Sequence, residues 1–159
     1  MVEKDDEDEN RIVAVAAGRC HGAAVDAGGR AYFFGCGALG GAAAGGGETE
    51  GLPRLVDDAI LRGRAVVDVA AGEHFTLASA ADGGMVGWGD GNSGQLGLDA
   101  EALARERRRD GDDLRNADAP GPAGGAVEVP MGEGARVVAP VAGYQHALAI
   151  VAKEAPRRR

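Results

Sequence analysis

The sequence has few aromatic side chains, few cysteines and no long apolar run. Aromatic residues make up 4% of the 159 positions. No stretch is long and apolar enough to span a membrane. The N-terminal residues also lack the basic start and apolar run of a secretory signal. Because no leader is recognisable, the two cysteines, Cys20 and Cys36, are expected to be reduced. These absences predict an intracellular protein, either cytoplasmic or nuclear.

Basic residues are in the minority. The chain has 17 Lys and Arg against 25 Asp and Glu, which gives a net charge of -8. An acidic chain repels phosphate backbones, so we expect no generic nucleic-acid binding. The acidic segment 1–10 is expected to be disordered, and the arginine-ended segment 153–159 to be a solvated basic tail.

Glycine is abundant, and its positions reveal an internal repeat. Gly18 and Gly35 recur 54 residues later as Gly72 and Gly89, and Gly143 opens a third, incomplete copy. In each copy, short apolar runs alternate with glycine turns, which is the pattern of antiparallel strands joined by hairpins. A unit of roughly fifty residues with four such runs has the size of one propeller blade. The predicted fold is therefore all-β, with antiparallel four-stranded blades of a partial β-propeller.

The repeats are expected to occupy residues 11–152, as units at 13–57, 66–130 and 137–152. An insertion at 99–126, first charged and then rich in Pro and Gly, interrupts the second unit. Within it, Ala100–Arg109 is predicted to form a short helix supported by a Glu101–Arg105 pair. The rest of the insertion is predicted to be a loop, either solvated or in contact with a partner.

The fourth run of each complete unit contains a proline. These runs are Leu52–Val56 and Val127–Pro130. Because proline cannot donate a hydrogen bond to a neighbouring strand, both runs are predicted to lie at sheet edges.

The second copy carries the most specific motif, the string WGDGNSGQLG at 88–97. With the Ala71-Gly72 and Asp82-Gly83 pairs that precede it, this string resembles the unit of the regulator of chromosome condensation repeat family. The first and third copies keep parts of the same pattern. The residues that carry the resemblance, and that we expect to be structural, are Gly18, His21, Gly35, Gly72, Asp82, Gly83, Trp88, Gly89, Gly94, Gln95, Leu96, Gly97, Gly143 and His146.

The resemblance implies a seven-bladed propeller, whereas this chain holds about two and a half units. We therefore expect a fragment, or a part of an assembly, that is completed by the remaining blades or by another copy of the chain. The resemblance also implies a non-catalytic scaffold for protein–protein interaction. The alternative is a guanine-nucleotide exchange factor for a small GTPase, an activity that some family members have. Chromatin binding, also known in the family, is disfavoured by the net negative charge.

Two further patterns were weighed against structural explanations. The segments 35–40 and 89–94 both spell G-x-G-x-x-G, but a dinucleotide site needs a helix to begin at that turn. Both segments run on into more glycine, so turn geometry explains them better, and neither an oxidoreductase activity nor a cofactor is expected. The spacing of the histidines and cysteines matches no zinc pattern, so no metal is expected. His21 and His146 are expected to be buried and bonded to backbone groups, and Trp88 to pack between adjacent units.

Overall fold

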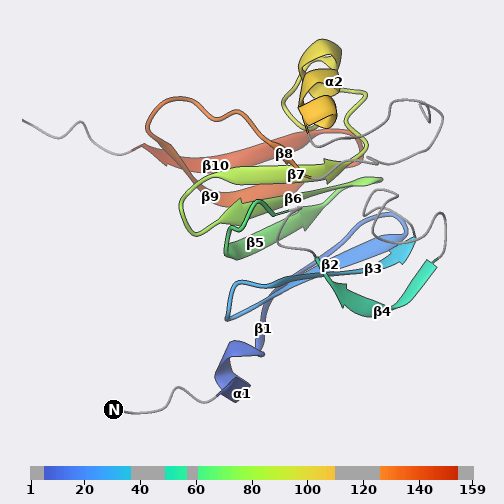
Figure 1. The fold of residues 1–159 in the computed structure, drawn as a ribbon, viewed down its shortest axis with the longest axis vertical. Coiled ribbons are helices and arrows are strands. Elements are labelled where there is room, and N and C mark those ends of the chain that lie inside the picture. Colours follow the sequence, from blue (N-terminus) through green and yellow to red (C-terminus); the bar gives the residue numbers. More distant parts are fainter. Residues whose placement is uncertain (1–5, 37–48, 57–60, 110–125, 154–159) are drawn as a thin grey trace, which may run out of the picture.

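The fold consists of three antiparallel sheets stacked on one another (Figure 1). A computed structural model describes residues 6–36, 49–56, 61–109 and 126–153. Two of the sheets have four strands and the third has two. The prediction of an all-β fold made of four-stranded antiparallel units is confirmed.

The strand order within each sheet follows the chain. Unit 1 contains β1 (Ile12–Ala17), β2 (His21–Asp26), β3 (Ala31–Cys36) and β4 (Thr49–Leu55). Unit 2 contains β5 (Val66–Ala71), β6 (Phe75–Ala80), β7 (Met85–Gly89) and β8 (Val127–Glu128). Unit 3 contains β9 (Ala135–Ala142) and β10 (Ala147–Lys153). The strands that coincide with the proline-containing runs, β4 and β8, are sheet edges as predicted.

Two helices accompany the sheets. α2 (Ala100–Arg109) has the predicted bounds, and the Asp99 carboxylate caps it by accepting a 2.7 Å bond from the Ala102 amide. α1 (Asp6–Glu9) is a single turn within the segment expected to be disordered, and the Glu9 carbonyl accepts a 2.9 Å bond from the Gly28 amide. Neither helix of the described residues has the length and apolar character needed to cross a membrane. The predicted loop over the rest of the insertion falls largely at 110–125, and the basic tail at 154–159, both outside the described residues.

The hydrophobic core lies between the sheets and is divided into two clusters. Phe33 of unit 1 and Trp88 of unit 2 belong to the first cluster. Phe75 of unit 2 and Val137 of unit 3 belong to the second. Because successive side chains of a strand point to opposite faces, unit 2 contributes to both clusters. We call the face that a unit turns toward the preceding unit its leading face, and the opposite one its trailing face.

The same backbone hydrogen bond joins each pair of neighbouring units. The Val66 amide donates to the Gly29 carbonyl at 2.8 Å, and the Val137 amide donates to the Gly83 carbonyl at 2.9 Å. Gly29 and Gly83 are equivalent positions of the repeat, in the turn between the second and third strands. The two junctions therefore have the same geometry, with trailing face against leading face.

The cysteine prediction is wrong. Cys20 is disulfide-bonded in the structure. The register of β2 and β3 pairs His21 with Gly35, so that backbone positions 20 and 36 come opposite each other one residue further on. Sequence spacing of 16 residues gave no sign of this, because the hairpin alone brings the two positions together.

Candidate functional site

Each unit begins with the same tight turn between its first and second strands. The amides of Gly18, Gly72 and Gly143 each donate a 2.8 Å bond to the carbonyl three residues later. A Cβ atom at Gly72 would lie 2.0 Å from the Phe75 ring, and the glycines of units 1 and 3 are equally close to His21 and His146. Only glycine leaves room for the ring, so the turn fixes the direction of the residue that follows it.

A second glycine supports each turn of the complete units from the neighbouring strand. Gly35 and Gly89 have φ angles of 103° and 99°, which side chains rarely adopt. A Cβ at Gly89 would also lie 2.3 Å from the His74 carbonyl oxygen. These positions hold the turn close to the third strand, and they leave the side chains of the turn pointing away from the sheet.

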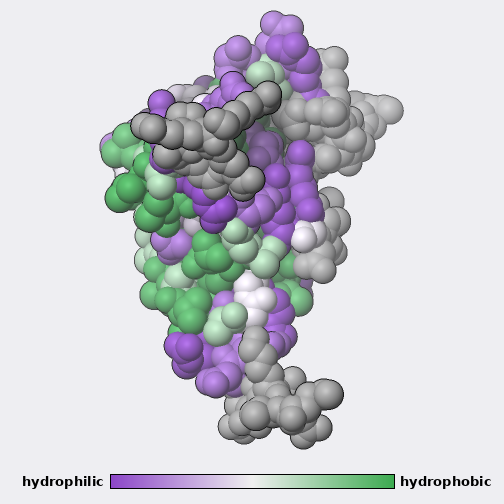
Figure 2. Space-filling view, turned by 90° about the vertical axis from the view of Figure 1, so that its left-hand side faces the viewer, coloured by the Kyte–Doolittle hydropathy of each residue, from purple (hydrophilic) through white to green (hydrophobic). Residues whose placement is uncertain are grey.

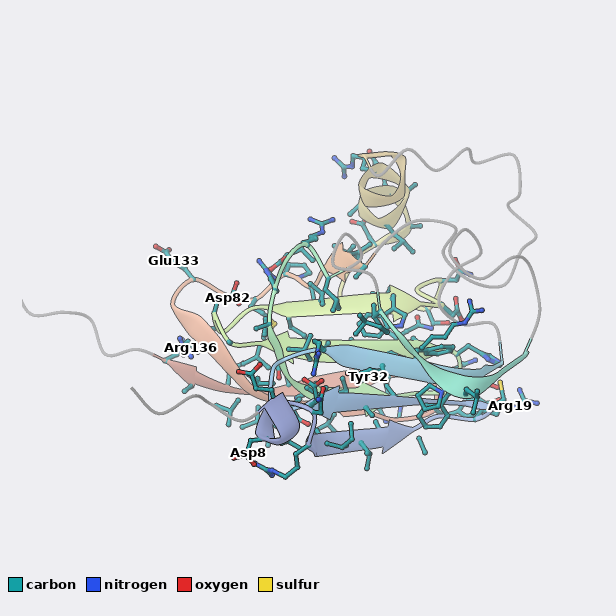
Figure 3. All side chains as sticks on the ribbon, turned by 60° about the horizontal axis from the view of Figure 1, so that its bottom comes forward. Asp8, Arg19, Tyr32, Asp82, Glu133 and Arg136 are labelled. Atoms are coloured by element: carbon teal, nitrogen blue, oxygen red, sulfur yellow. The ribbon has the colours of Figure 1, made fainter. Side chains whose placement is uncertain are left out.

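The residues directly after the signature glycines, Arg19, Glu73 and Tyr144, meet at one end of the strands. Figure 3 shows Arg19 at this end, whereas Asp82, Glu133 and Arg136 lie at the opposite end. The Glu73 carboxylate is buried, and its Oε1 atom is 2.6 Å from Arg19 Nη1. Its Oε2 atom accepts a 3.4 Å bond from Gln145 Nε2, and Tyr144 also donates a side-chain hydrogen bond to the carboxylate. One carboxylate thus joins all three units.

We call this group the Glu73 cluster; its members are Arg19, Glu73, His74, Tyr144 and Gln145. The Glu73 amide donates a 3.0 Å bond to the Tyr144 carbonyl, so the backbones of units 2 and 3 are also joined here. His74 Nε2 lies 3.6 Å from Glu73 Oε1. All members except Glu73 are exposed. The cluster is therefore an exposed polar surface arranged around a buried negative charge.

The electrostatics of the cluster favour the ionised carboxylate. The hydrogen bond from the Tyr144 hydroxyl is the main cause that holds the pKa of Glu73 below its ordinary value, with Arg19 adding to it. The same hydrogen bond raises the pKa of Tyr144, because ionised tyrosine could not donate it. At neutral pH the cluster holds a carboxylate, a guanidinium and a neutral phenol in fixed positions.

The glycine-rich segment 89–94 is closed by its own hydrogen bonds. Asp90 Oδ1 accepts a 3.0 Å bond from the Asn92 amide, and Gln95 bridges back to Asp90 Oδ2 at 3.2 Å. Turns follow this segment, and α2 begins only at Ala100. The helix N-terminus that a dinucleotide site requires is not at this turn. Leu96 is buried in the second core cluster, so the motif anchors the loop.

The three histidines lie in three different settings. His21 is buried, stacks on the Phe33 ring, and has Nε2 3.0 Å from Thr76 Oγ1 of unit 2. Burial lowers the pKa of His21 below its ordinary value. His146 is exposed, which corrects the expectation that it is buried. The equivalent side chains His21 and Phe75 are covered by a following unit, whereas nothing in the described residues covers His146.

Asp82 and Gly83 belong to the opposite end of the strands, beside an open cleft of about 450 Å³. Asp82 Oδ1 accepts a 2.8 Å bond from the Gly84 amide, which shapes the turn between β6 and β7. Arg64 crosses the cleft, with Nε 3.2 Å from Asp82 Oδ2 and Nη1 2.7 Å from Glu128 Oε2. The charges of this cleft therefore pair with one another, and we regard it as a structural junction.

Sequence reasoning missed the Glu73 cluster. The repeat pattern leaves the positions after the signature glycine unspecified, so neither Glu73 nor Tyr144 was singled out. The available signal was their equivalence: Arg19, Glu73 and Tyr144 each follow a signature glycine. Equivalent positions of stacked units come together at one end of the stack.

Comparison with known proteins gives a consistent result. Residues 66–95 match the family model of the regulator of chromosome condensation (RCC1) repeat. The chain is 41% identical over 88 residues to the E3 ubiquitin-protein ligase HERC2 of Homo sapiens, covering 54% of this chain and 2% of HERC2. It is 37% identical over 102 residues to protein pim1 of Schizosaccharomyces pombe, covering 58% of this chain and 18% of pim1. The chain thus spans a small part of the curated relatives it matches.

Solved structures share the fold. Prp20p from Saccharomyces cerevisiae superposes with a TM-score of 0.67 at 17% identity, covering 98% of this chain and 34% of Prp20p. Human WBSCR16 superposes with a TM-score of 0.63 at 17% identity, covering 90% of this chain and 31% of WBSCR16.

The matched repeat, its recurrence along the chain and the stacked four-stranded sheets agree with one another. The chain belongs to the regulator of chromosome condensation (RCC1) repeat family.

Proposed function

We propose that the chain is a non-catalytic protein-interaction module and that the Glu73 cluster is part of its contact surface. The observation that carries this proposal is the arrangement of an exposed Tyr144 and an exposed Arg19 around one buried carboxylate. Tyrosine and arginine are the side chains most enriched at protein interfaces, and they often dominate binding energy. Because Glu73 holds both side chains in place, a partner would find them already ordered, which lowers the entropic cost of binding.

The absence of catalysis is part of the proposal. HERC2 and the serine/threonine-protein kinase Nek9 of Xenopus laevis are named as enzymes, but this chain covers 2% and 10% of them. Their catalytic names therefore carry no weight for the matched repeats. The Glu73 carboxylate is already bonded to three side chains, which suits a structural anchor better than a general base.

The test is quantitative affinity capture with the full chain as bait, followed by mass spectrometry. Arg19→Ala and Tyr144→Ala are compared with wild type and with Arg136→Ala, an exposed arginine at the opposite end of the strands (Figure 3). We expect a partner whose capture falls at least about tenfold in both cluster variants and is unchanged in the Arg136 control. Equal capture by all four proteins would refute the role of the cluster.

A second candidate is guanine-nucleotide exchange on a small GTPase. It is favoured by the likeness to Prp20p, whose structure was determined together with its binding properties to Gsp1p and histones. Exchange requires only stronger binding of the nucleotide-free GTPase, so a rigid contact surface suffices. Release of a fluorescent guanine nucleotide from a panel of small GTPases separates the two candidates. Acceleration that is lost in Tyr144→Ala supports exchange, and no acceleration leaves the scaffold role.

An intracellular location, in the cytoplasm or nucleus, stays a prediction. The disulfide at Cys20 points the other way, because structural disulfides are rare in reducing compartments. Thiol labelling of the protein in intact cells distinguishes the two. A labelled Cys20 indicates a reducing location, and protection indicates an oxidising one.

A further inference from the structure

We propose that a second copy of this chain docks head to tail on the first, with the trailing face of unit 3 covering the leading face of unit 1. The proposal concerns the two outer sheet faces of the stack. It is independent of the Glu73 cluster, which lies at the strand ends. The argument compares positions that are equivalent in the repeat but differ in their neighbours.

The leading face of unit 1 is apolar and uncovered. Val15 is 73% exposed, whereas Val69, its equivalent 54 residues later, is 6% exposed because unit 1 covers it. Phe34 is partly exposed, whereas its equivalent Trp88 is buried in the same interface. The leading face of unit 1 thus presents the kind of side chains that a trailing face buries elsewhere in the chain.

The trailing face of unit 3 is the counterpart. Leu148 is 65% exposed, whereas its equivalent Leu77 is 0% exposed under unit 3. Ile150 is also exposed, although its equivalent Ser79 is buried. In Figure 2, hydrophobic residues gather along one side of the molecule, at the levels of the upper and lower sheets. Exposed apolar patches of this kind mark interaction sites.

A third set of positions shows that this exposure depends on the missing neighbour. Val13, Val67 and Val138 are equivalent, and all three are exposed. Val67 stays exposed although unit 2 has a neighbour on both sides. Exposure at Val67 is therefore a property of its position, whereas exposure at Val15 and Leu148 results from an uncovered sheet face.

Continuity with the existing interfaces identifies the occupant. Both junctions inside the chain bring a trailing face onto a leading face, with the same backbone hydrogen bond. A second copy offers a leading face of the same type to Leu148 and a trailing face of the same type to Val15. Such a contact is heterologous, because the two copies use different surfaces and each keeps one face free.

Sedimentation velocity of the full chain, over a hundredfold range of concentration, tests this proposal. Roughly physiological salt screens the repulsion between copies that each carry a net charge of -8. We expect wild type to associate with rising concentration. Val15→Asp removes the leading face and Leu148→Asp removes the trailing face, so each variant alone is expected to be monomeric. Mixed together, the two variants are expected to form a 1:1 dimer, because each retains the face that the other lacks.

Val67→Asp is the matched control, since it adds the same charge at an exposed valine and is expected to associate like wild type. Far-ultraviolet circular dichroism of each variant checks that the sheets are retained. A wild type that stays monomeric throughout the range overturns the proposal. Association of Val15→Asp alone also overturns it, because that result means that two trailing faces pair with each other. Loss of partner capture by Tyr144→Ala is measured separately, so failure of either proposal leaves the other standing.

Discussion

At the scale of single residues, space and backbone conformation decide different glycines. Gly89 combines a positive φ with a close approach to the His74 carbonyl. Gly94 has a positive φ of 78° but open space around its Cβ position, and Gly132 has neither constraint. These three glycines separate the two physical causes that keep a position free of side chains.

Substitution by alanine should rank the three positions. We expect Gly89→Ala to lower the free energy of unfolding by more than about 2 kcal/mol, because the methyl group meets backbone. Gly94→Ala should cost about 1 kcal/mol for the left-handed conformation alone. Gly132→Ala should stay within about 0.5 kcal/mol of wild type. Urea unfolding measures all three, and equal midpoints would contradict this account of the turns.

His21 makes the stability of the junction between units 1 and 2 depend on pH. Burial lowers the pKa of His21 in the folded chain below its ordinary value of 6.5. The unfolded chain therefore takes up this proton at a higher pH than the folded chain does. The contribution is complete above about pH 6.5 and is lost as the pH falls below it.

The corresponding experiment compares wild type with His21→Phe, the residue that unit 2 carries at the equivalent position as Phe75. We expect wild type to lose stability between about pH 7.5 and 5.5, and the variant to lose less. Histidine NMR titration of the folded protein gives the pKa of His21 directly. A value at or above 6.5 would show that burial does not govern this side chain.

At the scale of the strands, the sequence pattern was most informative where turns and alternation act locally. β1 and β5 have the predicted bounds, because a short apolar run between polar or glycine turns leaves few alternatives. α2 also has its predicted bounds, helped by the Asp99 cap.

Features that depend on contacts between units were not predictable in the same way. The exposure of His146 depends on whether another unit covers it, and no property of its own segment encodes that. Glu73 and Tyr144 are 71 residues apart and meet only because units 2 and 3 stack. Repeat equivalence narrows such contacts to a few positions, but the side chains at those positions vary from unit to unit.

The junction between sheets gives a prediction at this scale. Trp88 and Phe34 occupy equivalent positions, but only Trp88 is covered by a neighbouring unit. Trp88→Ala should cost about 3–5 kcal/mol, because it leaves a cavity in the first core cluster. Phe34→Ala should cost less than about 1 kcal/mol, because its ring is already partly exposed. Thermal or urea unfolding of the two variants measures the difference, and similar losses would mean that stacking does not bury this position.

At the scale of the whole molecule, the stack behaves as a short one-dimensional array. Each unit contacts only the adjacent units, so stability is the sum of the units and the junctions between them. Unit 2 has both faces covered, whereas units 1 and 3 each have one. The Glu73 cluster crosses both junctions, and its geometry therefore depends on the stack as a whole.

Amide hydrogen exchange on the full chain, at a concentration where it is monomeric, tests the stacked arrangement most directly. It reports the opening free energy of each strand separately. The account predicts the slowest exchange in β6 and β7, the inner strands of the unit that is covered on both sides. It predicts faster exchange in β10, which has an open edge and an uncovered trailing face. Uniform protection of all ten strands, or the slowest exchange in β9 and β10, would contradict it.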